Sequence, residues 1–221
     1  HHRFDIAHPT FWRQGNGDPV APFTQISAAD VRAGRYLPRA AFASERALAY
    51  LDALAGRGRY AHMIWPEHCE IGAWGHNIHD DLRAACNRWE AQQQAIVNFG
   101  GKGSNPWTEH YSAMMAEIPD PEDPDSQFNE ALFATLRAAD RIYIAGEAGS
   151  HCVKATTEHL IEHWPAAELA KLALIEDCVS PVSGFEAQYA EFLKTLRQCG
   201  VRVLKAVQVA AELSSGAQGI S

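Results

Sequence analysis

IYIAGEAGSHCVKATTEHL, at residues 142–160, contains a complete pattern of strand, turn and helix. Its first residues belong to the apolar run Arg141–Ala145, which predicts a buried strand because short runs of β-branched and aromatic residues favour strands. The glycines that follow predict a turn. Apolar residues then recur with helical spacing from Cys152 to His163, so the pattern predicts a helix that begins at the cysteine.

The same alternation of strand and helix continues along the chain. The predicted strands are Tyr60–Trp65, Ala95–Phe99, Arg141–Ala145, Lys171–Glu176 and Val201–Lys205. The predicted helices are Ala41–Ala55, His79–Gln93, Phe128–Ala139, Cys152–His163 and Phe185–Gln198. Strands that alternate with helices indicate a parallel sheet covered by helices on both faces. The sequence therefore predicts an α/β fold, a three-layer α/β/α sandwich with a mostly parallel sheet.

One domain is expected to span residues 1–221, since domains of ~100–200 residues are the norm. Residues 1–38 are rich in Pro, Gly and aromatic residues and show no sustained period, so they predict a long ordered loop. We expect the region 1–40 to lie near the active site. Ligands of parallel α/β sheets bind at the carboxyl ends of the strands, which selects the loops 65–75, 100–112 and 146–152.

The composition excludes several classes of protein. The formal net charge is −8 and no dense Lys/Arg run is present, so nucleic-acid binding is disfavoured. No stretch approaches the ~20 apolar residues that a membrane span needs. The five cysteines are an odd number without close spacing, which indicates no disulfide framework and favours a reducing, cytoplasmic setting. No CxxC pair exists to predict a structural zinc site.

Cys152 is the first candidate for chemistry. A thiol at the start of a helix lies at the positive end of the helix dipole, which lowers its pKa and raises its nucleophilicity. Backbone N–H groups at a helix start can also stabilise a developing oxyanion. The alternative interpretation is a small buried hydrophobic residue, which is the usual role of a free cysteine.

Two other loops carry candidate residues. Lys102 follows the predicted strand Ala95–Phe99 between glycines, where a lysine could activate a thiol or shuttle a proton; a solvated surface lysine is the alternative. His68 follows a rigid Trp-Pro step, and neutral imidazole is a common metal ligand, although a lone loop histidine is more often a surface residue. A further polar cluster near the start of the chain contains His1, His2, Asp5 and His8; His1 and His2 could instead be the remnant of a tag.

Three segments, taken in order, resemble the nicotinamidases, which are part of the isochorismatase-like cysteine hydrolases. WPEHC at residues 65–69 resembles the family's Trp-Pro-x-His-Cys segment. Lys102-Gly103 followed by EHYSAM resembles its lysine-bearing strand end and its Tyr-Ser-Ala-Phe segment. AGEAGSHCVKAT resembles its nucleophile turn. The resemblance runs from residue 1 to about residue 205.

The resemblance implies an Asp-Lys-Cys triad in which Cys152 attacks an amide carbon and Lys102 supports it. The family's Asp lies at the end of its first strand, and no segment here matches it. We therefore expect that N-terminal strands are missing from this chain, with about fifty residues upstream by comparison with the usual layout of the fold. The backbone N–H groups of Cys152 and Ala148 would form the oxyanion hole, with a cis peptide between Glu147 and Ala148.

The resemblance also implies a metal and a ring pocket. His1, His8 and His68 would hold a divalent metal ion, with zinc ahead of iron or manganese. Trp65 and Tyr111 would form walls of the pocket.

Glu147 is an unusual acidic residue in this position, and it could alter the preference for substrate. Gly149-Ser150-His151 also differs from the family's commoner aromatic-bearing version.

The function expected from these residues is hydrolysis of nicotinamide to nicotinate and ammonia through a Cys152 thioester. The alternatives are a hydrolase of another small amide, carbamoyl compound or vinyl ether, a non-catalytic binding or regulatory member of the fold, and a metal- or redox-sensing thiol protein. The expected partner is a small-molecule amide, with neither nucleic acid nor membrane. Assembly into a homo-oligomer is expected from the resemblance alone.

Overall fold

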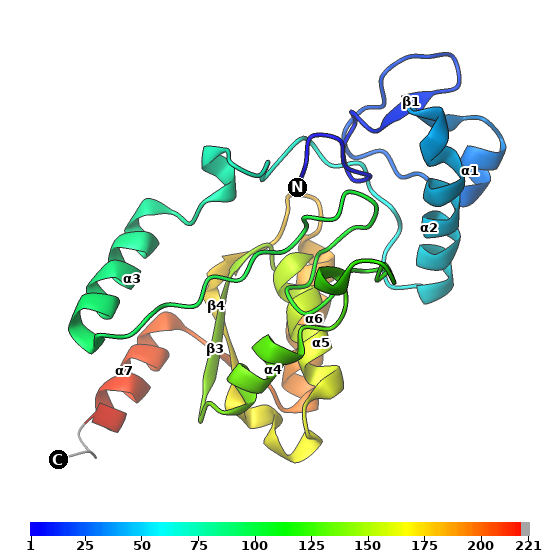
Figure 1. Cartoon of the computed structure of the whole chain (residues 1–221). Helices are drawn as coiled ribbons and strands as arrows, with labels where there is room; N and C mark the ends of the chain where they lie inside the picture. The colour runs from blue at the N-terminus through cyan, green and yellow to red at the C-terminus, as the bar shows by residue number, and fades with distance from the viewer. Residues whose placement is uncertain (218–221) are drawn as a thin grey trace. The chain divides into compact units, whose positions relative to one another are not determined.

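The computed structural model describes residues 1–217, and the chain divides into two compact units (Figure 1). Unit 1 consists of His1–Glu109 and Ala116–Ser126. Unit 2 consists of His110–Met115 and the described residues from Gln127 onward. The expectation of one domain over residues 1–221 stays a prediction, and its last four residues lie outside the described part of the chain.

Unit 2 contains the parallel sheet. Strands β3 (Ile142–Glu147), β4 (Leu172–Ser180) and β5 (Arg202–Leu204) pair in the order β3-β4-β5, and both pairs are parallel. The helices of unit 2 are α4 (Glu130–Arg137), α5 (Cys152–His163), α6 (Glu186–Cys199) and α7 (Ala206–Ala217), with a 3-10 turn at Ala166–Lys171. In Figure 1, α5 and α6 lie on one side of β3 and β4, and α7 lies on the other.

The core of unit 2 explains these elements. Leu172 and Leu174 of β4 are fully buried, as are Met114 and Leu196, because each strand presents its apolar residues to the helices that cover it. Helix α6 ends at Cys199 and is capped by Gly200, whose φ of 93° is the left-handed conformation that closes many helices. The predicted α/β fold with a parallel sheet and covering helices is confirmed.

Unit 1 is built from shorter pieces. Its strands β1 (Trp12–Gln14) and β2 (Tyr36–Pro38) form an antiparallel pair, and its helices are α1 (Ala28–Arg32), α2 (Ser44–Arg57) and α3 (Asp80–Gln93). Three 3-10 turns lie at Ala41–Ala43, Trp74–His76 and Pro124–Ser126. The prediction of a long ordered loop over residues 1–38 was wrong, because β1, α1 and β2 lie within this region.

Helix α1 forms inside that region for a local reason. The Ser27 side chain accepts from the backbone of Asp30, and the Asp30 carboxylate accepts from the backbone of Ser27, which completes a capping box. Ala28 and Val31 then turn toward the core, which also holds Trp12 and Ile64. Cap and burial together stabilise a helix too short to form by propensity.

Two predicted strands are absent from the described residues. The prediction of a strand at Tyr60–Trp65 was wrong, because Met63 makes only one isolated bridge, to Gln25. This segment is apolar because Ile64 and Trp65 are buried in unit 1. The prediction of a strand at Ala95–Phe99 was also wrong, since the segment is irregular and leaves Ile96 83% exposed. A short apolar run forms a strand only where a neighbour supplies the ladder of hydrogen bonds.

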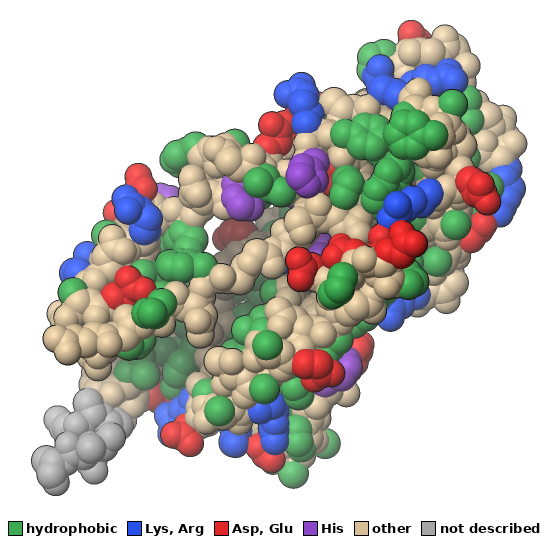
Figure 2. Space-filling model, in the orientation of Figure 1, with side chains coloured by type: hydrophobic (Ala, Val, Ile, Leu, Met, Phe, Trp, Pro, Cys, Tyr) green, Lys and Arg blue, Asp and Glu red, His purple; other side chains and the backbone are tan. Residues whose placement is uncertain are grey.

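Charged side chains of both signs are mixed on the surface of the described residues. On the face drawn in Figure 2, Lys and Arg side chains are interspersed with Asp and Glu rather than gathered into one basic stripe. None of the helices within residues 1–217 combines the length and the apolar character that crossing a bilayer requires.

His62 is a buried titratable group in the core of unit 1. Its ring lies 5.5 Å from that of Tyr50 and 5.7 Å from that of Trp12, and neither of its nitrogens makes a hydrogen bond to the described residues. Burial lowers the pKa of His62 to about 4, against smaller opposing effects of the Ile6 carbonyl and the Asp5 charge. The ring is therefore neutral in the folded protein at neutral pH.

This burial makes stability depend on pH. Between about pH 6.5 and pH 4, His62 takes up a proton in the unfolded chain but not in the folded one, so the free energy of unfolding falls as pH falls. A shift of this size is worth roughly 3 kcal/mol. We expect His62→Phe to lose about one proton's worth of slope in a plot of unfolding free energy against pH, measured by urea denaturation. The exposed His76→Phe is the control, and an unchanged slope in His62→Phe would contradict this account.

Candidate functional site

Cys152 lies where strand β3 turns into helix α5. The strand ends at Glu147 and the helix begins at Cys152, as the sequence pattern predicts. Between them the Ala148 carbonyl accepts from the backbone N–H of His151 and from that of Val153, each at 3.0 Å. The Glu147–Ala148 peptide is cis, as the resemblance implies. The cysteine is thus the first helical residue after a tight turn, with its side chain half-buried.

The turn before Cys152 is attached to the end of β4. The backbone N–H of Gly149 donates to the Ser180 carbonyl at 2.7 Å. A Cβ atom at Gly149 would lie 2.6 Å from side-chain atoms of Tyr189 and of Val179, so this position needs glycine for the close approach of the chain.

Glu147 takes part in the same attachment. Its carboxylate accepts from the backbone N–H of Ser180 at 3.1 Å, and the residue is exposed. The side chain therefore bridges the carboxyl ends of β3 and β4. The role of Glu147 in choosing a substrate stays a prediction.

Tyr111 lies beside this turn in unit 2. Its ring is 5.3 Å from that of His151, and only 6% of the residue is exposed. The segment that carries it is bound to α5, because the backbone N–H of Ala113 donates to Thr156 Oγ1 at 2.9 Å and that hydroxyl donates to the Cys152 carbonyl at 2.7 Å. Cys152, Ala148, Glu147 and Tyr111 are thus brought together within unit 2.

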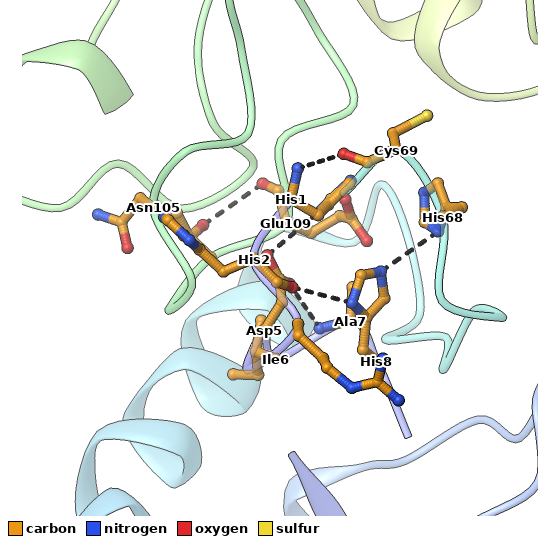
Figure 3. A network of polar contacts seen from close by, with 12 residues as sticks. His1, His2, Asp5, Ile6, Ala7, His8, His68, Cys69, Asn105 and Glu109 are labelled. Atoms are coloured by element: carbon orange, nitrogen blue, oxygen red, sulfur yellow. Dashed lines mark hydrogen bonds and ion pairs between the residues drawn. The ribbon is translucent and has the colours of Figure 1, made fainter. Parts of the chain in front are cut away.

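The three predicted metal ligands are brought together within unit 1 (Figure 3). The ring centroid of His1 is 4.6 Å from that of His68 and 5.2 Å from that of His8, and the His8 and His68 rings are also 5.2 Å apart. His8 Nε2 faces His68 Nδ1 at 3.3 Å. Residues sixty positions apart in the sequence therefore form one imidazole cluster, consisting of His1, His8 and His68.

Each ring of the imidazole cluster has an oxygen partner at Nδ1. His1 Nδ1 lies 3.0 Å from Asp5 Oδ2, His8 Nδ1 lies 3.1 Å from the His2 carbonyl, and His68 Nδ1 lies 2.7 Å from the Pro66 carbonyl. A carbonyl can only accept, so Nδ1 carries the proton in His8 and His68. In the neutral form this leaves the lone pair on Nε2, the nitrogen that a metal ion would take, and in His8 that lone pair faces the Nδ1–H of His68 at 3.3 Å.

Charge and burial act differently on the three rings. Burial lowers the pKa of His68 to about 4, against the hydrogen bond to the Pro66 carbonyl, and burial also lowers the pKa of His8. Burial lowers the pKa of His1 too, but the hydrogen bond to Asp5 and the charges of Glu109 and Asp5 outweigh it, so this pKa is raised. His8 and His68 are therefore neutral donors at neutral pH.

The donor set of the imidazole cluster fits a divalent metal ion in chemistry. Neutral imidazole nitrogens suit zinc, iron and nickel, and outer oxygen partners such as Asp5 are typical of such sites. Within residues 1–217, no group of three or more His, Cys, Asp or Glu side chains is placed so that it could hold a metal ion as it stands.

Lys102 and Trp65 also lie in unit 1. The charge of Lys102 acts on His1, and a Cβ atom at the adjacent Gly103 would lie 3.8 Å from the His1 ring, so this loop borders the imidazole cluster. Trp65 is 7% exposed, and its backbone N–H donates to the Ala7 carbonyl at 2.8 Å.

One polar residue near the imidazole cluster was not singled out by sequence. Glu109 is 4% exposed, and its charge raises the pKa of His1. It lies in the EHYSAM segment, but a single glutamate in a loop gives no sequence signal that separates it from a solvated one. Burial alone reveals it.

Comparisons with known proteins agree with this architecture. No protein-family model matches the chain, and no curated protein matches it in sequence. Among solved structures, the yeast nicotinamidase aligns over 92% of this chain and 75% of its own, with a TM-score of 0.57 and 17% identity. The yeast enzyme bound to the inhibitor nicotinaldehyde aligns over 93% of this chain and 76% of its own, with a TM-score of 0.57 and 16% identity. A nicotinamidase and pyrazinamidase of Acinetobacter baumanii aligns over 95% of this chain and 75% of its own, with a TM-score of 0.55 and 17% identity. The chain shares the fold of these nicotinamidases.

Proposed function

We propose that the chain is a cysteine amide hydrolase of nicotinamidase type, with Cys152 as the nucleophile. The observation that carries the proposal is the position of Cys152 as the first residue of α5, directly after the turn that ends β3. A thiol in this position meets the positive end of the helix dipole and the N–H groups of the first turn. The shared fold supports the proposal independently of this geometry.

The first half of the reaction is acyl transfer to sulfur. The Cys152 thiolate attacks the amide carbon and forms a C–S bond, while the carbonyl oxygen becomes an oxyanion. The backbone N–H groups of Cys152 and Ala148 would stabilise that charge, in the way that an oxyanion hole does. The C–N bond then breaks, the nitrogen takes up a proton, and ammonia leaves a thioester on Cys152.

The second half restores the enzyme. A water molecule attacks the thioester carbon, the C–S bond breaks, and the carboxylic acid leaves as the thiol is regenerated. The resemblance assigns support of the thiolate to Lys102, which belongs to unit 1. The resemblance assigns the base for the thiol to an Asp that no segment of this sequence matches, so the proposal relies on Cys152 and on the turn of unit 2 that carries it.

An aromatic amide such as nicotinamide suits the residues available. The resemblance assigns the flat apolar walls of the ring pocket to Trp65 of unit 1 and Tyr111 of unit 2, and both residues are almost fully buried. His1, His8 and His68 would hold a divalent metal ion, which when bound would supply a Lewis acid for the ring nitrogen of the substrate. Glu147, which bridges the two strand ends, would act at the rim of the pocket on the choice between amides.

Replacement of the nucleophile tests the reaction. We expect protein incubated with nicotinamide to release ammonia, and Cys152→Ala to lower kcat by at least about a thousandfold, because a general base cannot replace the missing sulfur. Ammonia release is followed by a coupled assay. Cys178→Ala, which removes an exposed thiol of β4, is the matched control. Turnover in Cys152→Ala equal to that of the parent would refute the role of Cys152.

Metal binding tests the imidazole cluster separately. We expect zinc to bind the chelator-treated protein in a calorimetric titration, and His68→Ala to weaken it by more than the roughly 10–100-fold that loss of an outer partner costs. Asp5→Asn should fall within that 10–100-fold range, since Asp5 only orients His1. The exposed His76→Ala should change nothing. Equal zinc affinity in His68→Ala and His76→Ala would exclude the imidazole cluster as the site.

A further inference from the structure

Ser150 and His151 form a buried polar pair that the proposed reaction does not use. They lie in the turn between β3 and α5, and they are 2% and 7% exposed. Ser150 Oγ accepts from the backbone N–H of Val182 at 3.0 Å, and it lies 2.9 Å from His151 Nδ1. The pair therefore connects the turn that carries Cys152 with the loop that follows β4.

The hydrogen bonds assign the direction of the Ser150–His151 contact. Among the described residues, His151 Nδ1 is the acceptor within reach of the Ser150 hydroxyl, whose other contact is the Val182 N–H. A buried hydroxyl donates its proton where an acceptor is present, so Ser150 donates to Nδ1. The neutral His151 ring then carries its own proton on Nε2. Burial, with a contribution from the Lys154 charge, lowers the pKa of His151 to about 4, so the ring is neutral at pH 7.

The His151 ring is also fixed by aromatic neighbours. It meets the Phe185 ring edge to face, with centroids 4.7 Å apart, and the Tyr111 ring at 5.3 Å. Phe185 belongs to the same loop as Val182, because its backbone N–H donates to the Val182 carbonyl at 2.9 Å. Two independent contacts, one polar and one aromatic, thus hold the ring against the loop between β4 and α6.

Because His151 is held in place, it also restrains the turn that leads to Cys152. His151 directly precedes Cys152, and its backbone N–H donates to the Ala148 carbonyl at 3.0 Å. A fixed ring therefore restrains the backbone from Ala148 to Cys152, which carries the nucleophile and both N–H groups of the suggested oxyanion hole. Misplacement of reacting groups by about 1 Å costs up to about a hundredfold in rate.

We propose that His151, held by the Ser150 hydroxyl, is a positioning residue that sets the reactivity of Cys152. It acts through the turn that carries Cys152. The inference rests on the proposed function only for the identity of the reaction, since the reactivity of the thiol can be measured without any substrate.

Three variants separate the polar contact from the packing. Ser150→Ala removes the hydroxyl and leaves the His151 ring in place. His151→Phe keeps an aromatic ring but has no acceptor for the hydroxyl. His151→Asn loses the ring but keeps an acceptor, because its side-chain oxygen falls near the position of Nδ1.

The readout is the rate of alkylation of Cys152 by iodoacetamide at pH 7, from peptide masses after digestion. We expect Ser150→Ala and His151→Phe to slow it about tenfold or more, and His151→Asn to recover most of the loss. The exposed Cys178 of the same sample is the internal control and should react at an unchanged rate. With nicotinamide, Ser150→Ala should lower kcat by a similar factor and leave KM within about threefold.

The outcomes distinguish this inference from the proposed function. Unchanged alkylation in both Ser150→Ala and His151→Phe, with altered melting temperature alone, would show that the pair only fills space and would overturn the inference. Slower alkylation in these variants, with no amide hydrolysed by the parent protein, would support the positioning role and refute the proposed function. Ser150→Ala removes one atom, so its folding can be verified by circular dichroism before either rate is compared.

Discussion

The pairing of β3 with β4 is the constraint on which the site in unit 2 depends. This parallel ladder brings the carboxyl ends of the two strands together at Glu147 and Ser180. Three further contacts then attach the nucleophile turn to the end of β4: Gly149 to the Ser180 carbonyl, Glu147 to the Ser180 N–H, and Ser150 to Val182. The cysteine can begin a helix at a defined place because the turn before it has little freedom to move.

Sequence patterns predicted this part of the molecule well. The run Arg141–Ala145 and the helical spacing from Cys152 locate β3 and α5 within two residues of their ends. Buried strands and amphipathic helices carry periodic signals that depend on local sequence, and glycine marks the turn between them. The rings of His1, His8 and His68 lie close together in unit 1. The family resemblance predicts this grouping, whereas no local sequence pattern does.

Other features depend on distant contacts that no local pattern contains. The apolar runs Tyr60–Trp65 and Ala95–Phe99 have strand-like composition, but neither has a strand partner within residues 1–217. Glu109 and His62 stand out because they are buried, and their burial depends on the packing of the whole of unit 1. His151 illustrates the same point, because its neighbours Tyr111 and Phe185 come from segments about forty and thirty-four residues away. These residues can be identified as candidates only when the packing of the folded chain is known.

The most direct test of the account is to trap the covalent intermediate. Protein mixed with nicotinamide is quenched in acid within the first turnover and analysed by intact mass and by peptide mapping. The account predicts a mass increase of one nicotinoyl group, confined to the peptide that contains Cys152 and sensitive to hydroxylamine, as a thioester is. Ammonia release without any acyl group on Cys152, or an acyl group on another cysteine, would contradict it.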